Sequence, residues 1–302
     1  MRVCSLLPSA TEILYAIGLG DEVFGVSHEC DFPADAGTKP SLLRTRIDPQ
    51  APAAEIDRQV REIIARGESI YAVDAELLES LAPDLILTQD LCHVCAASPD
   101  DLATALQRFP RQPRVLSLTP RSLQEVWDDI RRVGHATGHQ REAESLAQEL
   151  ARQVAAIAAT AARALFRPRV LCLEWMDPYY VGGHWVPEMV SAAGGEDVLG
   201  RLREPSFQVT TAQIAESDAE VIVVMPCGYD SARAARECNP ARFPESWNLL
   251  PAVRQGRIFA VDANAYFSRP GPRLADGVAL LARLIHPDLF SAGQLDSRFR
   301  RL

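Results

Sequence analysis

Short apolar runs alternate with amphipathic segments along most of the chain, and Gly, Pro or Asp residues stand between them. Apolar runs of about four to eight residues are typical of buried strands. Longer segments with helical spacing of apolar residues are typical of helices that cover a sheet. The predicted strands are residues 22–26, 83–89, 114–118, 169–173, 220–225 and 257–261, with a further short one at the N-terminus. The predicted helices are residues 9–18, 56–66, 74–81 and 99–109, one that begins at Ser231 and one that ends near Leu284.

Local signals mark where several of these helices begin. Ser9 and Glu12 have the spacing of a capping box, in which the Ser caps the helix and the Glu reaches back to it. Asp74 precedes another helix as an N-cap residue. Strands that alternate with helices in this way predict parallel sheets built from βαβ units.

A different pattern fills residues 122–165, where helix-forming residues recur almost without Gly or Pro. This segment is predicted to be one long helix, or two helices with a break near Gly138. Because it lacks the Gly and Ser of a flexible linker, we expect a rigid connector.

The segments on either side of the connector resemble each other in two places. Residues 13–25 are similar to 189–200, and residues 76–87 to 213–224, in the same order. Two matched pairs predict two similar lobes. The predicted fold class is α/β, with two Rossmann-like lobes that have parallel sheets and are joined by a long connecting helix. The predicted domains are residues 1–119, 120–166 and 167–302.

An aromatic-rich segment lies between the strand at 169–173 and a helix that begins near Pro187 and ends at Gly194–Gly195. We interpret it as a loop, and it holds Glu174, Trp175, Tyr179, Tyr180, His184 and Trp185. Ligands of parallel sheets bind beyond the carboxyl ends of the strands, where this loop is expected. The alternative is that the aromatic residues only cover the core.

Other segments that follow predicted strands carry residues of the same kinds. If the two sheets face each other across the connector, these segments line one cleft, which suits a large, flat, partly apolar ligand. The candidate ligand-binding residues are Ser9, Glu174, Trp175, Tyr179, Tyr180, His184, Trp185, Tyr229, Tyr266, Phe267 and Arg269. His184 is interpreted either as a hydrogen-bonding side chain or as an axial ligand to a bound metal complex.

Four segments give the chain a resemblance to a known family: residues 5–12, 82–87, 182–185 with Gly194–Gly195, and 266–274. The chain resembles the cobalamin-binding branch of the substrate-binding proteins of ABC importers, in the class with a rigid helical linker, over nearly its whole length. The resemblance implies a cobalamin or related corrinoid ligand held between two lobes that move little, and no enzymatic activity.

The same resemblance implies docking on a permease through one acidic residue in each lobe. Glu76 matches the first of these positions. At the second position the chain has Ala212, with Gln213 and Glu216 nearby. Siderophore, haem and metal binders share the fold, so the motifs are more specific for the fold than for the ligand.

A set of thiols and imidazoles follows two predicted strands of the first lobe: His28, Cys30, Cys92, His93 and Cys95. Thiolate and imidazole ligands at this spacing suit zinc or another thiophilic metal. A thiolate ligand to a bound corrinoid is part of the same interpretation. The alternatives are a redox or disulfide pair, and cysteines with no special role. An odd total of seven cysteines favours reduced thiols over a framework of disulfides.

Composition and charge narrow the classes of partner. The net charge of −9 argues against a nucleic-acid partner, because phosphate binding needs a basic face. No apolar run approaches the roughly 20 residues that a membrane helix needs. The chain begins at Met1 without the pattern of a signal peptide, so we expect a cytoplasmic protein.

Two functions are consistent with these observations. The first is a two-lobed receptor for cobalamin or a related metal chelate, with an ABC permease as its partner. The second is a cytoplasmic metal- or thiol-dependent protein that uses His28, Cys30, Cys92 and Cys95 on the same scaffold.

Overall fold

The structure, a computed structural model, describes residues 1–89, 99–290 and 297–302, and it divides the chain into two compact units. Unit 1 comprises Met1–Pro120 and Val126–Gln148, and unit 2 comprises Arg121–Glu125 and Glu149–Leu302. Both units are α/β, as predicted. The expected domain boundaries remain a prediction. None of the described helices is long and apolar enough to cross a bilayer.

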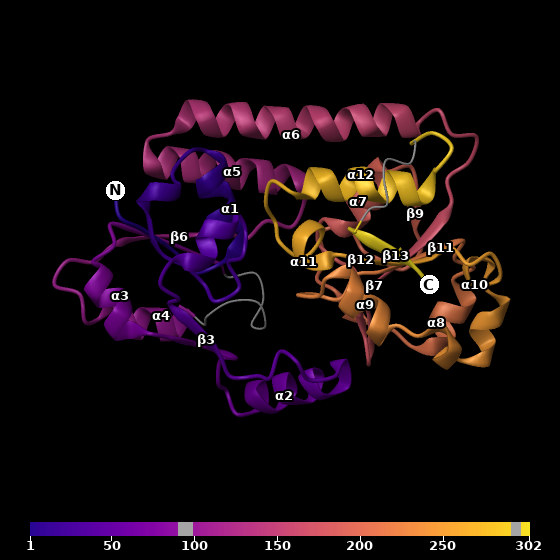
Figure 1. The fold of residues 1–302 in the computed structure, drawn as a ribbon, viewed down its shortest axis with the longest axis horizontal. Helices are drawn as coiled ribbons and strands as arrows, with labels where there is room; N and C mark the ends of the chain where they lie inside the picture. Colours follow the sequence, from indigo (N-terminus) through magenta and orange to yellow (C-terminus); the bar gives the residue numbers. More distant parts are fainter. Residues whose placement is uncertain (90–98, 291–296) are drawn as a thin grey trace. The chain divides into compact units, whose positions relative to one another are not determined.

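Unit 1 is built on a four-stranded parallel sheet in the order β2-β1-β5-β6 (Figure 1). Its strands are β1 (Val3–Ser5), β2 (Val23–Gly25), β5 (Leu85–Thr88) and β6 (Arg114–Ser117). A separate antiparallel pair, β3 (Leu43–Thr45) and β4 (Tyr71–Val73), was not predicted. The helices are α1 (Pro8–Ala16), α2 (Ala53–Ala65), α3 (Ala75–Leu81) and α4 (Pro99–Leu106).

The core of unit 1 joins the sheet to these helices through apolar side chains. Cys4 of β1 and Ile86 of β5 contact Leu78 of α3 and Leu102 of α4 in one buried cluster. Burial of such side chains stabilises the folded state by about 1.5–3 kcal/mol each. Burial also raises the pKa of the Cys4 thiol to about 12, so this cysteine acts as a small apolar side chain.

The connector consists of two helices, α5 (Leu123–Thr137) and α6 (Gln140–Ala161). Gly138 separates them with a φ of +80°, a conformation that glycine adopts without a steric penalty. The ion pair between Arg131 and Glu144 (2.8 Å) joins the two helices within unit 1. A Cβ at Gly134 would lie 2.3 Å from the Ala143 Cβ, so glycine permits their close approach.

Unit 2 contains a seven-stranded mixed sheet in which β10-β8-β7-β11-β12-β13 form the path and β9 pairs with β7. Its centre is parallel, namely β7 (Arg169–Met176), β11 (Val221–Val224) and β12 (Ile258–Val261). The other strands are β8 (Tyr179–Val181), β9 (Glu196–Asp197), β10 (Phe207–Gln208) and β13 (Phe299–Arg301). Because β8, β10 and β13 pair antiparallel, the expected parallel arrangement is limited to β7, β11, β12 and the short β9.

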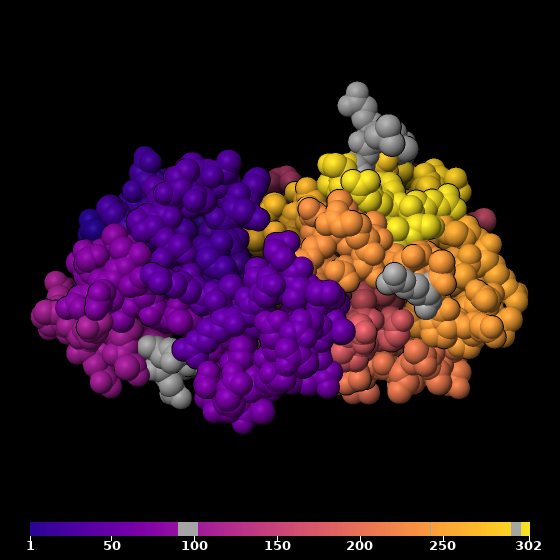
Figure 2. All heavy atoms as spheres, turned by 60° about the horizontal axis from the view of Figure 1, so that its bottom comes forward, coloured from indigo at the N-terminus to yellow at the C-terminus, as the bar shows by residue number. Residues whose placement is uncertain are grey.

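Helices cover this sheet on its two faces. They are α7 (Val186–Ala192), α8 (Thr211–Glu216), α9 (Ser231–Glu237), α10 (Pro251–Arg254), α11 (Ala263–Tyr266) and α12 (Leu274–Ile285). The yellow residues of α12 lie directly against orange residues of unit 2 in Figure 2. Trp247 is fully buried with Leu171, Ile222 and Ile258 in the main cluster of this unit.

Two local predictions were wrong. Ser9 does not cap α1, because the N-cap residue is Leu7 and Pro8 occupies the first turn without a side-chain cap. The expected aromatic loop after residue 173 is instead a β-hairpin, because β7 continues to Met176 and Tyr179 begins β8. Asp74 does cap α3, and its carboxylate accepts the Leu77 N–H at 3.0 Å.

Asp197 is a buried carboxylate beside β7. One oxygen, Oδ1, accepts the main-chain N–H groups of Leu199 (3.2 Å) and Gly200 (2.6 Å). The other oxygen, Oδ2, is buried and makes no hydrogen bond to the described residues. Burial raises the pKa of Asp197 from 3.8 to about 6, against the opposing effect of those two hydrogen bonds.

This carboxylate should make the folded state less stable as the pH rises from about 4 to about 7. The reason is that the folded protein binds the Asp197 proton more tightly than the unfolded chain does. Asp197→Asn should remove this dependence. The free energy of unfolding of the variant should therefore rise by about 1–3 kcal/mol relative to that of the parent between about pH 4.5 and about pH 7.5. Urea unfolding of both proteins measures the difference, and parallel pH profiles would contradict the assignment.

Candidate functional site

The parallel strands of unit 2 end at one edge of the sheet, and main-chain hydrogen bonds join the segments that follow them. The N–H of Met225, just after β11, donates to the Leu173 carbonyl of β7 at 2.8 Å. The N–H groups of Ala263 and Asn264, just after β12, donate to the Tyr229 carbonyl at 3.0 and 3.2 Å. The three strand ends are therefore one connected structure, at the edge where parallel sheets bind ligands.

The β7–β8 hairpin divides its aromatic residues between two faces. Trp175 lies opposite Tyr180 in the strand register, and Met176 lies opposite Tyr179. Residues directly opposite each other in an antiparallel pair share a face. Met176 and Tyr179 pack in the core, where the Tyr179 ring lies 5.0 Å from that of Trp247. Trp175 and Tyr180 therefore lie on the other face of the hairpin.

We call Trp175, Tyr180 and Tyr229 the aromatic platform. The Trp175 and Tyr229 rings are 5.5 Å apart in an edge-to-face arrangement, which favours aromatic contact. The Arg233 guanidinium lies 3.8 Å from the Tyr229 ring centroid and donates to its hydroxyl at 3.2 Å. Trp175 and Tyr180 are half-buried, whereas Tyr229 is buried. The buried ring thus supports Trp175, and the two half-buried rings keep accessible surface.

Trp185 and Phe267 join two other segments of the same unit. The Trp185 indole N–H donates to the Phe267 carbonyl at 2.8 Å. Their exposed fractions are only 5% and 2%. The bond connects the start of α7 to the end of α11, so these residues hold the backbone in place. Their expected contact with a ligand remains a prediction.

Glu174 lies next to the platform at the end of β7 and is half-buried. The Ser206 hydroxyl and the Gly183 main-chain N–H donate to its carboxylate, and both bonds favour the ionised form. Burial outweighs them and raises the pKa of Glu174. A Cβ at position 183 would lie 2.4 Å from the Ser206 nitrogen, so only glycine fits there.

His184 occupies a left-handed conformation, with a φ of +52°. Its main-chain N–H donates to the Glu204 carbonyl at 2.7 Å. Burial lowers the pKa of the imidazole, and the positive charge of Arg121 lowers it further. A neutral imidazole retains a ring nitrogen that can accept a hydrogen bond or bind a metal.

The segment after β12 adds polar groups at this edge. Burial raises the pKa of Asp262, while Arg269 and Arg273 act in the opposite direction. Tyr266 is half-buried, and its carbonyl would lie 2.2 Å from a Cβ at Gly277, so glycine allows α11 to approach α12. Arg269 is buried.

The candidate residues of unit 1 are described separately. Ser9 is buried in the first turn of α1. Nearby in the same helix, the Thr11 hydroxyl donates to the Ser5 hydroxyl at 2.9 Å and lies 3.1 Å from the Cys30 sulfur. Glu76 lies in the first turn of α3 with 86% of its side chain exposed.

The expected metal site receives no support from the described residues. Cys92, His93 and Cys95 lie outside them. His28 packs its ring 5.4 Å from that of Tyr71, whereas the Cys30 sulfur contacts Thr11. Within the described ranges, no group of three or more His, Cys, Asp or Glu side chains could hold a metal ion.

Sequence reasoning missed two residues that shape the site, Arg233 and Ser206. Arg233 lies in the first turn of α9, four positions after Tyr229. Side chains four positions apart are neighbours on a helix, so this spacing was the available signal. Ser206 donates to Glu174 from a segment with no regular pattern, and no local signal in the sequence indicates this contact.

Comparison with known proteins places the chain in a structural and sequence context. A family model described as periplasmic binding protein matches residues 3–265. The substrate-binding lipoprotein YvrC of an ABC transporter from Bacillus subtilis is 25% identical over 96% of this chain and 81% of its own length. A vitamin B12-binding protein of Vibrio cholerae is 25% identical over 92% of this chain and 86% of its own.

Solved structures show the same fold. The periplasmic haem-binding protein RhuT from Roseiflexus matches with a TM-score of 0.72 and 23% identity, over 95% of this chain and 98% of its own. The periplasmic vitamin B12-binding protein BtuF of Vibrio cholerae matches with a TM-score of 0.69 and 22% identity, over 95% and 96%.

The expected cytoplasmic location is contradicted by these comparisons. The matched proteins are a lipoprotein and periplasmic binding proteins, which act outside the cytoplasm. The expectation rested only on the first residues of the chain, and similarity over nearly the whole chain outweighs it.

Trp185→Phe should loosen the candidate site in a way that a matched variant does not. Trp247 is also buried, and its indole N–H donates to the Thr211 carbonyl at 3.1 Å, but it lies in the core. Both Phe variants should lose about 1–3 kcal/mol of unfolding free energy. Only Trp185→Phe should speed amide exchange in residues 263–269, as measured by mass spectrometry. Equal exchange in the two variants would show that the Trp185 bond does not hold this segment.

Proposed function

Because the chain belongs to the periplasmic binding protein family, we propose that it binds cobalamin or a closely related corrinoid as the solute-binding component of an ABC importer. In this proposal the protein carries its ligand to a permease and performs no chemistry on it. The expected position of the ligand between two lobes is part of the proposal.

The named relatives support the corrinoid class. Vitamin B12-binding proteins of two Vibrio species match 92% of this chain. One from Yersinia pestis matches 74% of it. The aligned length therefore includes both units.

The aromatic platform is the observation in this chain that carries the proposal. Trp175 and Tyr180 are half-buried neighbours across the hairpin, and the buried Tyr229 ring supports Trp175. Large planar ligands with apolar faces gain most from such rings, and a single well-packed aromatic contact adds about 0.5–1.5 kcal/mol beyond burial of its area. Because the rings are already held in place, little conformational freedom is lost when a ligand binds.

Polar groups near the platform can bind the edge of a corrinoid. The carboxylates of Glu174 and Asp262 can accept hydrogen bonds from the amide groups at the edge of a corrin ring. Arg269 and Arg273, which lie close enough to Asp262 to lower its pKa, can pair with an anionic group at the edge of a ligand. The neutral imidazole of His184 is proposed as a hydrogen-bonding group or as an axial ligand to the central metal.

A docking role for Glu76 is part of the proposal. Its exposed carboxylate lies 4.0 Å from Arg108, so it keeps most of its surface for a partner. In α8, Ala212 is exposed, while the Gln213 side chain is engaged in a capping box with Thr210. Glu216, exposed at the end of that helix, is the acidic residue proposed for the second contact.

The metal- or thiol-dependent alternative has no comparable support. It depends on Cys92 and Cys95, which lie outside the described ranges, and His28 and Cys30 contact different neighbours.

Isothermal titration with cyanocobalamin should show saturable binding with one site. Trp175→Ala should weaken it tenfold or more, because loss of a central aromatic side chain typically costs more than about 1.4 kcal/mol. Phe166→Ala is the matched control, because Phe166 is exposed on unit 2 before the first residue of β7, at the opposite end of that strand. It should leave the affinity unchanged.

Haemin titrated in parallel separates the possible outcomes. Binding of haemin but not cyanocobalamin would reject the corrinoid class and retain a tetrapyrrole receptor. Failure of both ligands to bind would reject the proposed function. Equal losses in the two Ala variants would reject the platform as the contact surface.

A further inference from the structure

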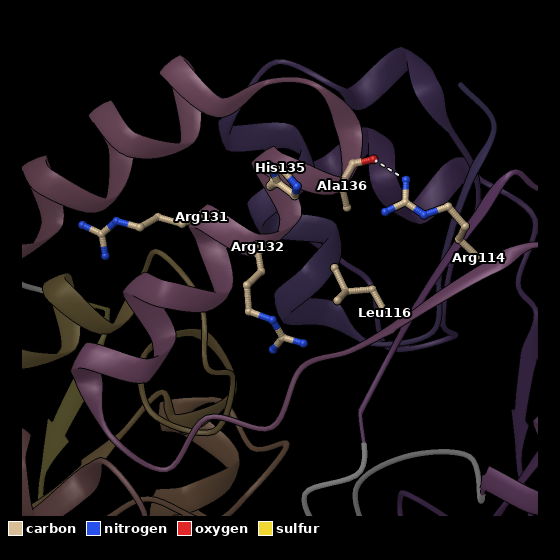
Figure 3. A pocket seen from close by; sticks show the side chains of 6 residues that line it. All are labelled: Arg114, Leu116, Arg131, Arg132, His135 and Ala136. Carbon is tan, nitrogen blue, oxygen red and sulfur yellow. Dashed lines mark hydrogen bonds between the residues drawn. The ribbon is translucent and has the colours of Figure 1, made fainter.

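Unit 1 has a surface cavity of about 380 Å³, open to solvent, between β6 and the last turns of α5 (Figure 3). Its lining residues are Arg114, Leu116, Arg131, Arg132, His135 and Ala136. The lining follows β6 from Arg114, its first residue, to Leu116, and Arg132 donates to the carbonyl of Ser117, the last residue, at 2.9 Å. None of the lining residues is a candidate ligand-binding residue of the proposed corrinoid site, so we treat the cavity as a different site.

The cavity has an apolar interior. Figure 3 shows Leu116 projecting between Arg114, Arg132 and His135, while the Arg131 side chain extends away from them. Ala136 and the aliphatic stems of the arginines complete the wall, as long basic side chains commonly do. A short hydrocarbon chain therefore suits the interior.

Two of the three arginines already have carboxylate partners. Arg131 pairs with Glu144 (2.8 Å) and Asp128 (2.9 Å), and Arg132 pairs with Asp129 (2.6 Å). These pairs neutralise one side of the rim, and they leave little attraction there for a further anion.

Arg114 differs from them. Among the described residues, its guanidinium donates one hydrogen bond, from Nη1 to the Ala136 carbonyl at 3.3 Å, and pairs with no carboxylate. His135 likewise makes no hydrogen bond or ion pair to any described residue. A cation near a helix C-terminus stabilises the helix, which accounts for one Arg114 donor. A guanidinium has five donors, so four remain for a ligand.

We propose that this cavity binds a small anionic amphiphile, with the carboxylate or sulfonate paired to Arg114 and the hydrocarbon part against Leu116 and Ala136. The geometry of Arg suits a carboxylate because two parallel N–H donors match its two oxygens. The Arg114 guanidinium disfavours cationic ligands and forms no ion pair with neutral ones. The inference does not depend on the proposed transport function.

Octanoate and 1-octanol are the probes, because they share a hydrocarbon chain and differ in charge. The Leu116 methyl signals of leucine-labelled protein report binding by NMR, assigned with Leu116→Ile. Octanoate should shift them saturably, and octanol should bind roughly tenfold more weakly, because it lacks the carboxylate that pairs with Arg114. This comparison uses the parent protein. Its result therefore does not depend on whether a substitution of Arg114 disturbs folding.

Arg114→Gln should weaken octanoate roughly tenfold and leave octanol unchanged, whereas Arg114→Lys should keep a preference for octanoate. Arg111→Gln is the matched control, because Arg111 is exposed in the same unit and does not line the cavity. Three results would overturn the proposal: no shift of the Leu116 methyl signals, equal affinity for octanoate and octanol, or equal effects of Arg111→Gln and Arg114→Gln.

Discussion

The candidate site depends on the bonds that join three strand ends of unit 2 into one rigid structure. The Tyr229 carbonyl accepts two N–H groups from the start of α11, and the Trp185 indole donates to the Phe267 carbonyl. Each bond connects segments that follow different strands. A buried carbonyl or indole N–H left without its partner costs about 1–3 kcal/mol. These hydrogen bonds therefore oppose the separation of the segments that they join. The ring surfaces above them are consequently held in position before any ligand arrives.

This constraint separates two roles that aromatic residues at one edge can have. Tyr179, Trp185 and Phe267 use their rings or main chain to hold the fold, and they are packed among other residues. Trp175 and Tyr180 lie on the opposite face of the hairpin from Tyr179, and both are half-buried. The difference follows from the two-residue period of a strand, since neighbouring side chains point to opposite faces. Only some of the aromatic residues that cluster in the sequence therefore belong to the platform in the fold.

Much of the fold could be predicted because its signals are local. Buried strands such as β11, with four consecutive apolar residues, and the Asp74 cap of α3 are visible in single segments. The hairpin of β7 and β8 was missed because Asp177 and Pro178 look like the start of a loop, and the pairing of Trp175 with Tyr180 is a property of two strands together. The partner of Glu174 depends on the path of residues 200–206, which no periodic pattern specifies. Which residues share a face of the platform could therefore be learned only from the three-dimensional structure.

The central claim is that a preformed aromatic edge of unit 2 receives a flat ligand. Hydrogen exchange measured with and without saturating cyanocobalamin tests it most directly. The account predicts slower exchange in residues 173–181, 226–230 and 262–266, and no change in residues 162–168 before β7. Ligand binding that protects the segment before β7, or that leaves all three strand-end segments unchanged, would contradict it.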